Sequence, residues 1–482
     1  MSSVSGIKFA LVYPPYGPVR NEPGIKTVKE NYGIFPSLSL LYVAGILEKA
    51  GCQVLFIDAH AEDLSLEETV RRLEEFSPDF IGYTLTTYLF FQSLDWIKAI
   101  KEKLPNIPVV VGGVHLSIYA KETLGYPSID YAVTGEAEES LPAMLHAIVD
   151  KKDLSQVRGI AFKQPDGTIV VTPREKEVDV NLAPFPARHL IKNDIYYSFI
   201  SKYKNFSVFI TSRGCPYKCI FCEQGSKTFR PRTPKNVVDE LELCVKEFGI
   251  RELDFFDSSF TIRKQRVIEI CDEIKRRKLD IVWAARTRVD CITDDVLKAM
   301  ASAGCTRIYY GIESGNREIL HTLKKSTSIE MYHDVVRRTK QHGIHTFGYF
   351  MIGNPYENEI SIRQTIRLAL ELDLDYAQFS KVTPMPATEM YTMLLKEHGR
   401  DYWREHIAQG IDDDIPRPLC DMTDEEIQRW TRLAYVRFYY RPKYILRALS
   451  RMKSREEFLR SARTAWQMLV SPPSEEGMEV VG

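Results

Sequence analysis

The sequence lacks a long apolar run, an excess of charge of one sign and an even set of cysteines. No stretch reaches the roughly 18–20 apolar residues that a transmembrane helix needs. The N-terminus has no basic segment followed by an apolar one, so we expect no signal peptide. We therefore expect no transmembrane segment and a cytoplasmic location, and we leave a peripheral membrane association open.

Charge and cysteine content exclude further classes of protein. The 482 residues include 64 Lys and Arg against 65 Asp and Glu, so the net charge is −1. This balance argues against a nucleic-acid partner held by a broad basic surface. Nine cysteines are an odd number, which disfavours a secreted disulfide scaffold. Three of the nine lie within eight residues, and this cluster carries most of the functional argument.

Short Val- and Ile-rich runs alternate with amphipathic segments in residues 1–150, which is typical of βαβ units and a parallel sheet. We expect five strands and a doubly wound, flavodoxin-like domain that binds its ligand at the carboxyl ends of the strands. The predicted strands are 8–13, 53–57, 80–83, 108–111 and 131–133, and the predicted helices are 38–49, 66–76, 93–103 and 140–149.

The rest of the chain divides into three parts. Residues 151–200 are predicted to hold a β-hairpin around Asp166-Gly167 and a linker. Residues 201–385 contain six further strand–helix units, too few for a closed eight-stranded barrel, so we expect a partial (β/α)6 barrel. Residues 386–482 are predicted to be a C-terminal helical domain with a disordered tail. Their alternating aromatic and basic residues indicate either packing against the barrel or a lid over its mouth.

The cysteine cluster follows an apolar strand directly. Cys215, Cys219 and Cys222 have C-x3-C-x2-C spacing, and no fourth cysteine is near. Three thiolates on one short loop can bind three irons of a four-iron cluster and leave the fourth iron open. A zinc site needs a further cysteine pair or histidine at a defined spacing, and none follows. We therefore predict that these three cysteines are metal ligands and catalytic.

This motif at the end of the first strand of a βα series resembles the radical S-adenosylmethionine (SAM) superfamily. The resemblance implies that the three cysteines hold a [4Fe-4S] cluster whose open iron binds SAM. Reduction would cleave SAM to methionine and a 5′-deoxyadenosyl radical, which takes hydrogen from an unreactive C–H bond. The resemblance also implies SAM contacts at later strand ends. The predicted SAM-binding residues are Phe221, Asp257, Ser258, Arg286, Glu313, Ser314 and Gly353, and Arg288 also follows the third strand of the series.

The N-terminal domain carries three motifs at strand ends: Tyr13-Pro14-Pro15, Gly112-Gly113-Val114-His115 and Thr134-Gly135-Glu136. A doubly wound domain with these motifs ahead of such a barrel resembles the cobalamin-binding subclass. For His115 two roles stay open, contact with the corrin edge and capping of the turn. The predicted cobalamin contacts are Pro15, Thr86, Thr87, Tyr88, Gly112, Gly113, His115, Gly135 and Glu136.

The lower face of the cobalt is a separate question. Asp58-Ala59-His60 resembles part of the D-x-H-x-x-G motif that supplies an axial histidine, but Asp63 replaces the glycine and the motif follows the second strand. We therefore expect His60 to be a surface loop residue. The loop after the third strand, with Thr86, Thr87 and Tyr88, is the better candidate to face the cobalt.

The resemblance covers residues 8 to 385. The family that the chain resembles includes anaerobic magnesium-protoporphyrin ester cyclases and hopanoid methylases. The predicted cofactors are a [4Fe-4S] cluster, SAM and cobalamin. The predicted function is C-methylation of a small-molecule or lipid substrate, with flavodoxin or ferredoxin as a reducing electron donor. One alternative is a radical cyclase or C–C bond-forming enzyme acting on a tetrapyrrole or isoprenoid lipid. Another is a non-catalytic Fe–S or cobalamin binding protein.

Overall fold

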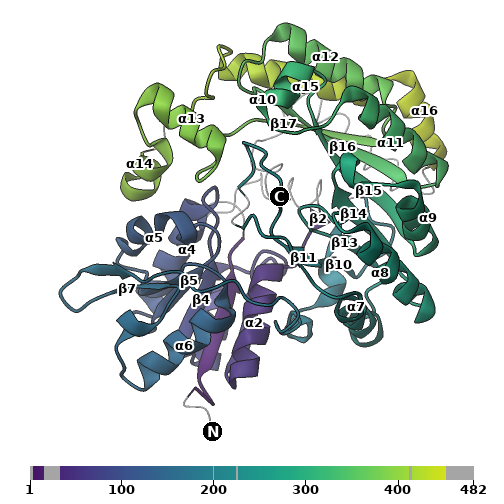
Figure 1. Cartoon of the computed structure of the whole chain (residues 1–482). Coiled ribbons are helices and arrows are strands. Elements are labelled where there is room, and N and C mark those ends of the chain that lie inside the picture. Colours follow the sequence, from purple (N-terminus) through teal and green to yellow (C-terminus); the bar gives the residue numbers. More distant parts are fainter. Residues whose placement is uncertain (1–3, 16–32, 199, 224–225, 412–414, 452–482) are drawn as a thin grey trace. The chain divides into compact units, whose positions relative to one another are not determined.

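The computed structural model describes residues 4–15, 33–198, 200–223, 226–411 and 415–451. The chain forms two compact units (Figure 1). The first comprises residues 1–208, 239–252 and 401–413, and the second contains the remainder. The predicted disordered tail lies outside the described residues.

The first unit is built on a seven-stranded sheet. Pairing is parallel from β3 to β6, and β7 and β8 continue the sheet as an antiparallel hairpin. The strands in sheet order are β3 (Gln53–Asp58), β1 (Lys8–Tyr13), β4 (Phe80–Thr84), β5 (Val109–Gly112), β6 (Tyr131–Val133), β7 (Ile160–Lys163) and β8 (Ile169–Val171). The expected five-stranded sheet is thus corrected to seven strands, because the hairpin joins the edge of β6.

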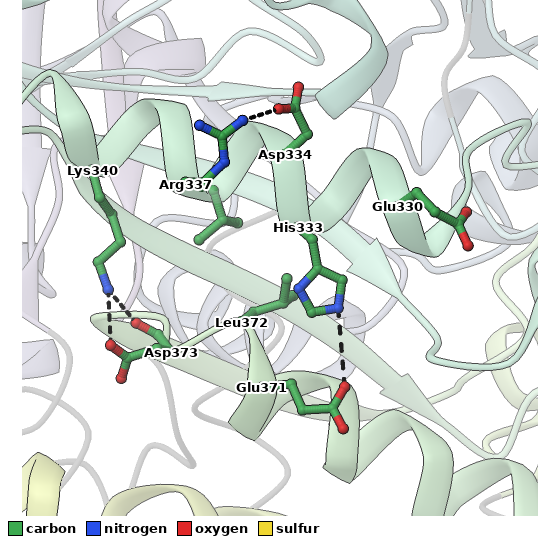
Figure 2. Close-up of a pocket in the computed structure, with 9 residues that line it drawn as sticks. Glu330, His333, Asp334, Arg337, Lys340, Glu371, Leu372 and Asp373 are labelled. Carbon is green, nitrogen blue, oxygen red and sulfur yellow. Dashed lines mark hydrogen bonds and ion pairs between the residues drawn. The ribbon is translucent and has the colours of Figure 1, made fainter.

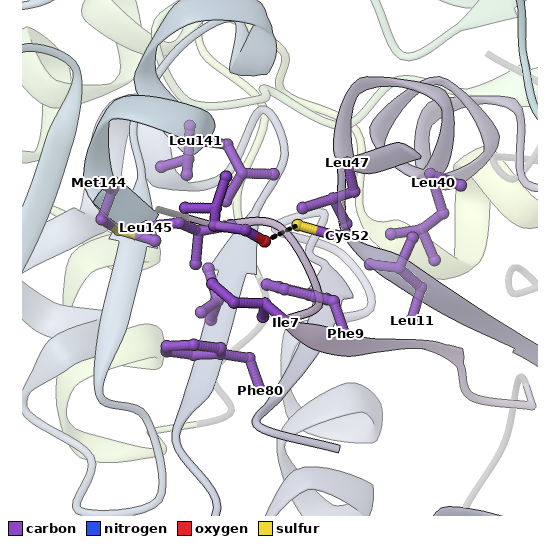
Figure 3. Packing of buried hydrophobic residues seen from close by; sticks show 14 of the residues in the cluster. Ile7, Phe9, Leu11, Leu40, Leu47, Cys52, Phe80, Leu141, Met144 and Leu145 are labelled. Carbon is purple, nitrogen blue, oxygen red and sulfur yellow. Dashed lines mark hydrogen bonds between the residues drawn. The ribbon is translucent and has the colours of Figure 1, made fainter. Parts of the chain in front are cut away.

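Apolar residues of β1, α2 and α6 form the core of this unit (Figure 3). Leu40, Leu47, Leu141 and Leu145 come from two helices that pack on one another, and Phe9 and Phe80 stack at 5.8 Å on neighbouring strands. The helices of the unit are α2 (Leu38–Ala50), α3 (Leu66–Phe76), α4 (Phe90–Lys103), α5 (Leu116–Leu124), α6 (Ala137–Val149) and α14 (Tyr402–Gln409).

Helix α14 comes from the C-terminal part of the chain, yet it packs against α5 of the first unit. Arg404 forms an ion pair with Glu122 at 3.0 Å. The Tyr126 hydroxyl donates to the carbonyl of Ile407 at 2.6 Å. A continuous C-terminal helical domain would not place this helix on the first unit.

The second unit contains a half-barrel sheet of six strands in sequence order. Its strands are β10 (Phe206–Phe209), β13 (Glu252–Phe255), β14 (Val282–Thr287), β15 (Cys305–Glu313), β16 (His345–Ile352) and β17 (Tyr376–Lys381). Its helices are α8 (Lys264–Arg276), α9 (Asp294–Ser302), α10 (Arg317–Thr322), α11 (Ile329–Gln341), α12 (Glu359–Glu371), α13 (Glu389–His398), α15 (Asp424–Tyr439) and α16 (Pro442–Arg451). Helix α7 (Pro234–Phe248) belongs mainly to the first unit, which includes residues 239–252. The predicted partial (β/α)6 barrel is confirmed.

One face of this sheet packs against helices and the other carries aromatic and charged side chains. Tyr310 bonds Thr339 of α11 at 2.7 Å, whereas its neighbour Tyr309 points to the opposite face. There the Tyr309 ring stacks on Tyr349 at 5.9 Å, and the hydroxyl donates to the buried carboxylate of Asp254 at 3.0 Å. These contacts join β13, β15 and β16 on that face of the sheet.

The edge strand β17 is covered by α15. The Tyr439 hydroxyl donates to the carbonyl of Ala377 at 2.7 Å and lies 3.1 Å from its amide, and the Tyr435 hydroxyl accepts from Phe379 at 3.2 Å. These contacts satisfy backbone groups that an open sheet edge would leave unpaired. Packing against the barrel is therefore the role of these aromatic residues. No helix among the described residues is long and apolar enough to cross a membrane.

A buried ion pair holds the linker to the first unit. Arg188 and Glu240 are 1% and 0% exposed, and their charged groups are 2.5 Å apart. Arg188 also donates to Ser207 Oγ at 3.3 Å and to the carbonyl of Val208 at 2.9 Å. Arg188 thus joins the linker to β10, the first strand of the half-barrel, and to α7.

Replacing Arg188 by Ala should destabilise the first unit by about 3–5 kcal/mol, because Glu240 would stay buried without its partner. Calorimetry and urea unfolding measure the change. Arg71→Ala, which removes an exposed ion pair with Glu75, is the control and should cost about 0.5 kcal/mol or less. An equally small loss for Arg188→Ala would contradict the assignment, whereas Arg188→Met with Glu240→Leu should recover most of the stability.

Candidate active site

The three clustered cysteines lie on a loop that leaves the sheet after β11 (Ser212–Arg213), which pairs with β12 (Arg230–Pro231). Gly214 opens the loop at φ = 77°, and a Cβ there would lie 2.0 Å from the carbonyl oxygen of Thr228. Only glycine fits this turn. The Cys215 amide donates to Ser226 and the Cys222 amide to Cys219.

Apolar packing holds the far side of the loop. Ile220 is buried with Leu323 and Met390, and its amide and carbonyl both bond the backbone of these elements. Cys215 is buried, and Cys219 and Cys222 are partly exposed; none of the three forms a disulfide. The loop is thus held at Gly214, where it begins, and at Ile220, near its last cysteine.

The donor set fits an iron–sulfur cluster. Within the described part of the chain, no three His, Cys, Asp or Glu side chains converge on a single metal ion. In a four-iron cluster each cysteine binds a different iron, so three thiolates need not converge on one atom. Cys215, Cys219 and Cys222 would hold such a cluster.

Asp257 clamps the strand end that carries the cysteine loop. One carboxylate oxygen accepts from the amides of Thr211 and Ser212 at 2.6 and 3.3 Å, and the other accepts from their hydroxyls at 2.5 and 2.7 Å. The residue is 1% exposed. Both oxygens already accept from the backbone and side chains of Thr211 and Ser212, so we assign Asp257 a positioning role, and its SAM contact stays a prediction.

Two arginines complete this clamp. Arg266 donates to the carbonyls of Thr211 and Arg232 at 2.6 and 2.7 Å, and Arg232 donates to the carbonyl of Ile210 at 3.0 Å. Burial lowers the pKa of Arg266 to about 10, so its guanidinium remains charged at neutral pH. These backbone carbonyls at the strand end thus accept hydrogen bonds from charged guanidinium groups.

Lys325 brings several predicted residues together. Its ammonium lies 2.7 Å from the Glu313 carboxylate and 5.9 Å from the centre of the Phe221 ring, and its carbonyl accepts from Arg288. Lys325 and Glu313 are about 5% and 6% exposed. Sequence reasoning missed Lys325, because a lysine beside Lys324 in a polar loop carries no motif. Lys324 itself is exposed and pairs with Glu389.

The other predicted SAM residues lie in different surroundings. Ser258 is exposed at the end of β13. Arg286 lies 3.6 Å from the centre of the Phe256 ring and 4.8 Å from that of Tyr309. Ser314 is fully buried and bonds Thr365 at 3.1 Å. Its hydroxyl also accepts from the Asn316 amide, so Ser314 holds this strand end, and its SAM contact stays a prediction.

Gly353 ends β16 in a left-handed conformation, φ = 93°. The buried Glu357 accepts from the amides of Gly353 and Asn354 at 2.6 and 3.0 Å, and burial raises the pKa of this carboxyl to about 7. A Cβ at Gly353 would lie 2.8 Å from Arg417 Cδ. The glycine is therefore required by the turn itself, whatever else contacts it.

The strand ends of the first unit leave room for a ligand. Added Cβ atoms at Gly112 and Gly135, at the ends of β5 and β6, would meet no atom within 4 Å. Thr86 is exposed, and Pro15, Tyr88, Gly113 and Glu136 are partly exposed. Absence of side chains at such ends lets a large planar ligand approach the backbone, so these residues fit a cobalamin site.

Two histidines of the first unit are buried. His115 is fully buried, and its Nδ1 and Nε2 lie 3.1 and 2.9 Å from the hydroxyls of Thr87 and Thr123. Both ring nitrogens of His115 thus have hydroxyl neighbours, and the cobalamin contacts of His115 and Thr87 stay predictions. His60 is 4% exposed and its ring meets the edge of Tyr13, so the expected surface position is wrong.

A surface hollow of about 570 Å³ lies between α11 and the end of α12 (Figure 2). Its charged groups are paired with one another, as in Arg337 with Asp334 and Lys340 with Asp373. It contains none of the predicted site residues. The hollow therefore adds no chemistry to the site.

Comparison with known proteins supports the two halves separately. Residues 26–145 match the B12 binding domain, and residues 209–369 match the Radical SAM superfamily. An uncharacterized methyltransferase of Pyrococcus horikoshii is 34% identical over 92% of this chain and 94% of its own. The chain belongs to the cobalamin-binding radical SAM family. The predicted family, enzyme class and cofactors are thereby confirmed: a [4Fe-4S] cluster, SAM and cobalamin.

Two further proteins resemble this chain, one in sequence and one in fold. The anaerobic magnesium-protoporphyrin IX monomethyl ester cyclase of Rubrivivax gelatinosus is 30% identical over 75% of this chain and 67% of its own. The radical SAM methyltransferase TsrM of Kitasatospora setae, solved with tryptophan and a SAM analogue, shares the fold with a TM-score of 0.70. It is 18% identical and covers 90% of each chain.

Replacing Asp257 by Ala should weaken retention of the cluster at least tenfold. The change leaves four buried donors of Thr211 and Ser212 without an acceptor, and hydrogen bonds to a charged group contribute about 1.5–3 kcal/mol each. Iron release to a chelator, measured anaerobically after reconstitution, gives the rate. Asp272→Ala, at an exposed position of α8, is the control. Release rates equal to wild type would show that Asp257 does not position the loop.

His115 should make the first unit less stable in acid. Burial lowers its pKa from 6.5 to about 3. Above pH 6.5 both folded and unfolded states are neutral at this site. Below pH 6.5 the imidazole becomes protonated in the unfolded chain but stays neutral in the folded chain. Protonation therefore lowers the free energy of unfolding by about 2 kcal/mol at pH 5.

Urea unfolding at pH 7 and pH 5 tests this effect. His115→Gln removes the titration, so the loss of stability between the two pH values should be about 2 kcal/mol smaller in the variant. Parallel pH profiles for the two proteins would mean that His115 is protonated, or exposed to solvent, in the folded state.

Proposed function

We propose that this enzyme methylates an unactivated carbon of a small-molecule or lipid substrate. The observation that carries the proposal is the joining of Lys325, Glu313, Phe221 and Arg288 beside the cysteine loop, in a chain that also has a cobalamin-binding domain. When bound, the cluster and SAM supply a radical that takes hydrogen, and cobalamin carries the methyl group.

The residues around the cysteine loop have distinct proposed tasks. Cys215, Cys219 and Cys222 hold the cluster, and Asp257 keeps their loop in place. Lys325 offers a buried positive charge to the SAM carboxylate, and Glu313 can accept from its amino group or ribose. Phe221 borders the adenine. Ser258, Arg286 and Gly353 stand at or just after the ends of β13, β14 and β16 and stay predicted contacts of SAM.

In the first unit we propose that cobalamin lies over the ends of β5 and β6. Gly112, Gly113 and Gly135 would admit the corrin close to the backbone. Thr86, Tyr88, Pro15 and Glu136, which lie in the loops after the strands, would also hold the cobalamin. When bound, cobalamin would supply the carrier of the methyl group.

The partners follow from this chemistry. A low-potential donor such as flavodoxin or ferredoxin would supply electrons to the cluster. Nothing in the described residues distinguishes a lipid from a smaller substrate. The relationship to a tetrapyrrole cyclase makes ring formation the second candidate, with the same cofactors and a different fate of the substrate radical.

Product analysis separates the two candidates. Each methylation should consume two SAM molecules and yield one S-adenosylhomocysteine and one 5′-deoxyadenosine. With SAM that carries a deuterated methyl group, the reconstituted enzyme should transfer the label to a product from a panel of lipid and tetrapyrrole substrates. A cyclase would form 5′-deoxyadenosine with an unlabelled product and no stoichiometric S-adenosylhomocysteine.

Cys219→Ala is the matched variant for this experiment. It should lose the cluster and all 5′-deoxyadenosine formation, but keep cobalamin, because the two cofactors are assigned to residues of different units. Wild-type protein that binds cluster and cobalamin yet forms neither S-adenosylhomocysteine nor 5′-deoxyadenosine would contradict the proposal.

A further inference from the structure

We infer that Arg288 raises the reduction potential of the cluster by donating a hydrogen bond to the sulfur of Cys219. Its Nη1 lies 3.5 Å from Cys219 Sγ. The inference rests on the proposed role of Cys219 as a cluster ligand. It concerns a property of the bound cluster rather than the reaction.

The guanidinium is locked in place by contacts on every side. Nε and Nη2 form a fork with the two carboxylate oxygens of Asp290, both at 2.9 Å, and Nη2 also donates to the carbonyl of Lys325. The guanidinium carbon lies 3.8 Å from the centre of the Tyr217 ring. Nη1 is thus the nitrogen left to point at the cysteine.

Burial makes this donor effective. Arg288 is 5% exposed, and water therefore does not screen its charge from the sulfur. Asp290 and Cys219 raise the pKa of the guanidinium, which keeps its proton at any working pH. Tyr217 lies between the first two cysteines in sequence, and its hydroxyl is 2.8 Å from Cys291 Sγ, which fixes the ring beneath the guanidinium.

The direction of the effect follows from charge. Reduction adds one electron to the cluster, and its negative charge spreads onto the cysteine sulfurs. A fixed cation and a hydrogen bond at one sulfur stabilise the reduced form, as hydrogen bonds to cluster sulfurs generally do. Asp290 carries the opposite charge. Removing the charge of Arg288 should therefore lower the midpoint potential, and removing that of Asp290 should raise it.

An anaerobic redox titration followed by electron paramagnetic resonance tests the inference on reconstituted full-length protein without SAM or substrate. Arg288→Gln should reduce the ratio of reduced to oxidised cluster about tenfold at a fixed potential, which for one electron corresponds to a midpoint lower by about 59 mV. Arg288→Lys keeps the positive charge but loses the two-bond contact with Asp290, so its midpoint should lie between those of wild type and Arg288→Gln. Asp290→Asn should raise the midpoint.

Arg317→Gln is the control, since it removes the same charge from an exposed position of α10. A midpoint equal to wild type in Arg288→Gln protein that holds four irons would overturn the inference. A shift of the same sign in Arg288→Gln and Asp290→Asn would also overturn it, because it would indicate loosening of the loop. Loss of the cluster in Arg288→Gln, Arg288→Lys and Asp290→Asn would overturn it as well, because Arg288 and Asp290 would then be needed for cluster assembly.

These outcomes are independent of methyl transfer. A wild-type protein that binds no cluster would contradict the proposed function. A wild-type cluster with a midpoint indifferent to Arg288 would contradict only the present inference.

Discussion

The carboxylate of Asp257 is the constraint on which the candidate site depends. A cysteine loop that carries three thiolates must leave its strand at one defined angle, or the sulfurs cannot share one cluster. Asp257 sets that angle by accepting from two successive amides and two successive hydroxyls of the strand end. Arg266 and Arg232 then satisfy the carbonyls on the same stretch, so both kinds of backbone group are bonded before any cofactor binds.

The fold was predictable because its signals are local. Short apolar strands alternating with amphipathic helices indicate parallel βα units wherever they occur, and the predicted strand at 8–13 matches β1. The join between hairpin and sheet was not predictable, because pairing of β6 with β7 depends on where the chain returns in space. The packing of α14 on α5 was missed for the same reason.

At the site, residue spacing predicted ligands better than roles. C-x3-C-x2-C places three sulfurs on one loop whatever surrounds it, so the cysteines could be found from sequence. Asp257 and His115 stand at strand ends, where polar residues commonly meet ligands, yet neighbouring hydroxyls occupy both of them. Whether a polar group faces a cavity or a hydroxyl is decided by packing, which one sequence does not show.

The charges beside the cysteine loop come in neutral pairs, and this explains how they can be buried at all. Arg288 is balanced by Asp290, and Lys325 by Glu313. An isolated buried ion would cost several kcal/mol, whereas a paired one costs far less. The pairs differ in geometry: Asp290 holds Arg288 in a rigid fork through both carboxylate oxygens, while Lys325 donates to one oxygen of Glu313. The first pair is thus suited to a fixed electrostatic task, and the second to exchanging partners when a zwitterionic ligand arrives.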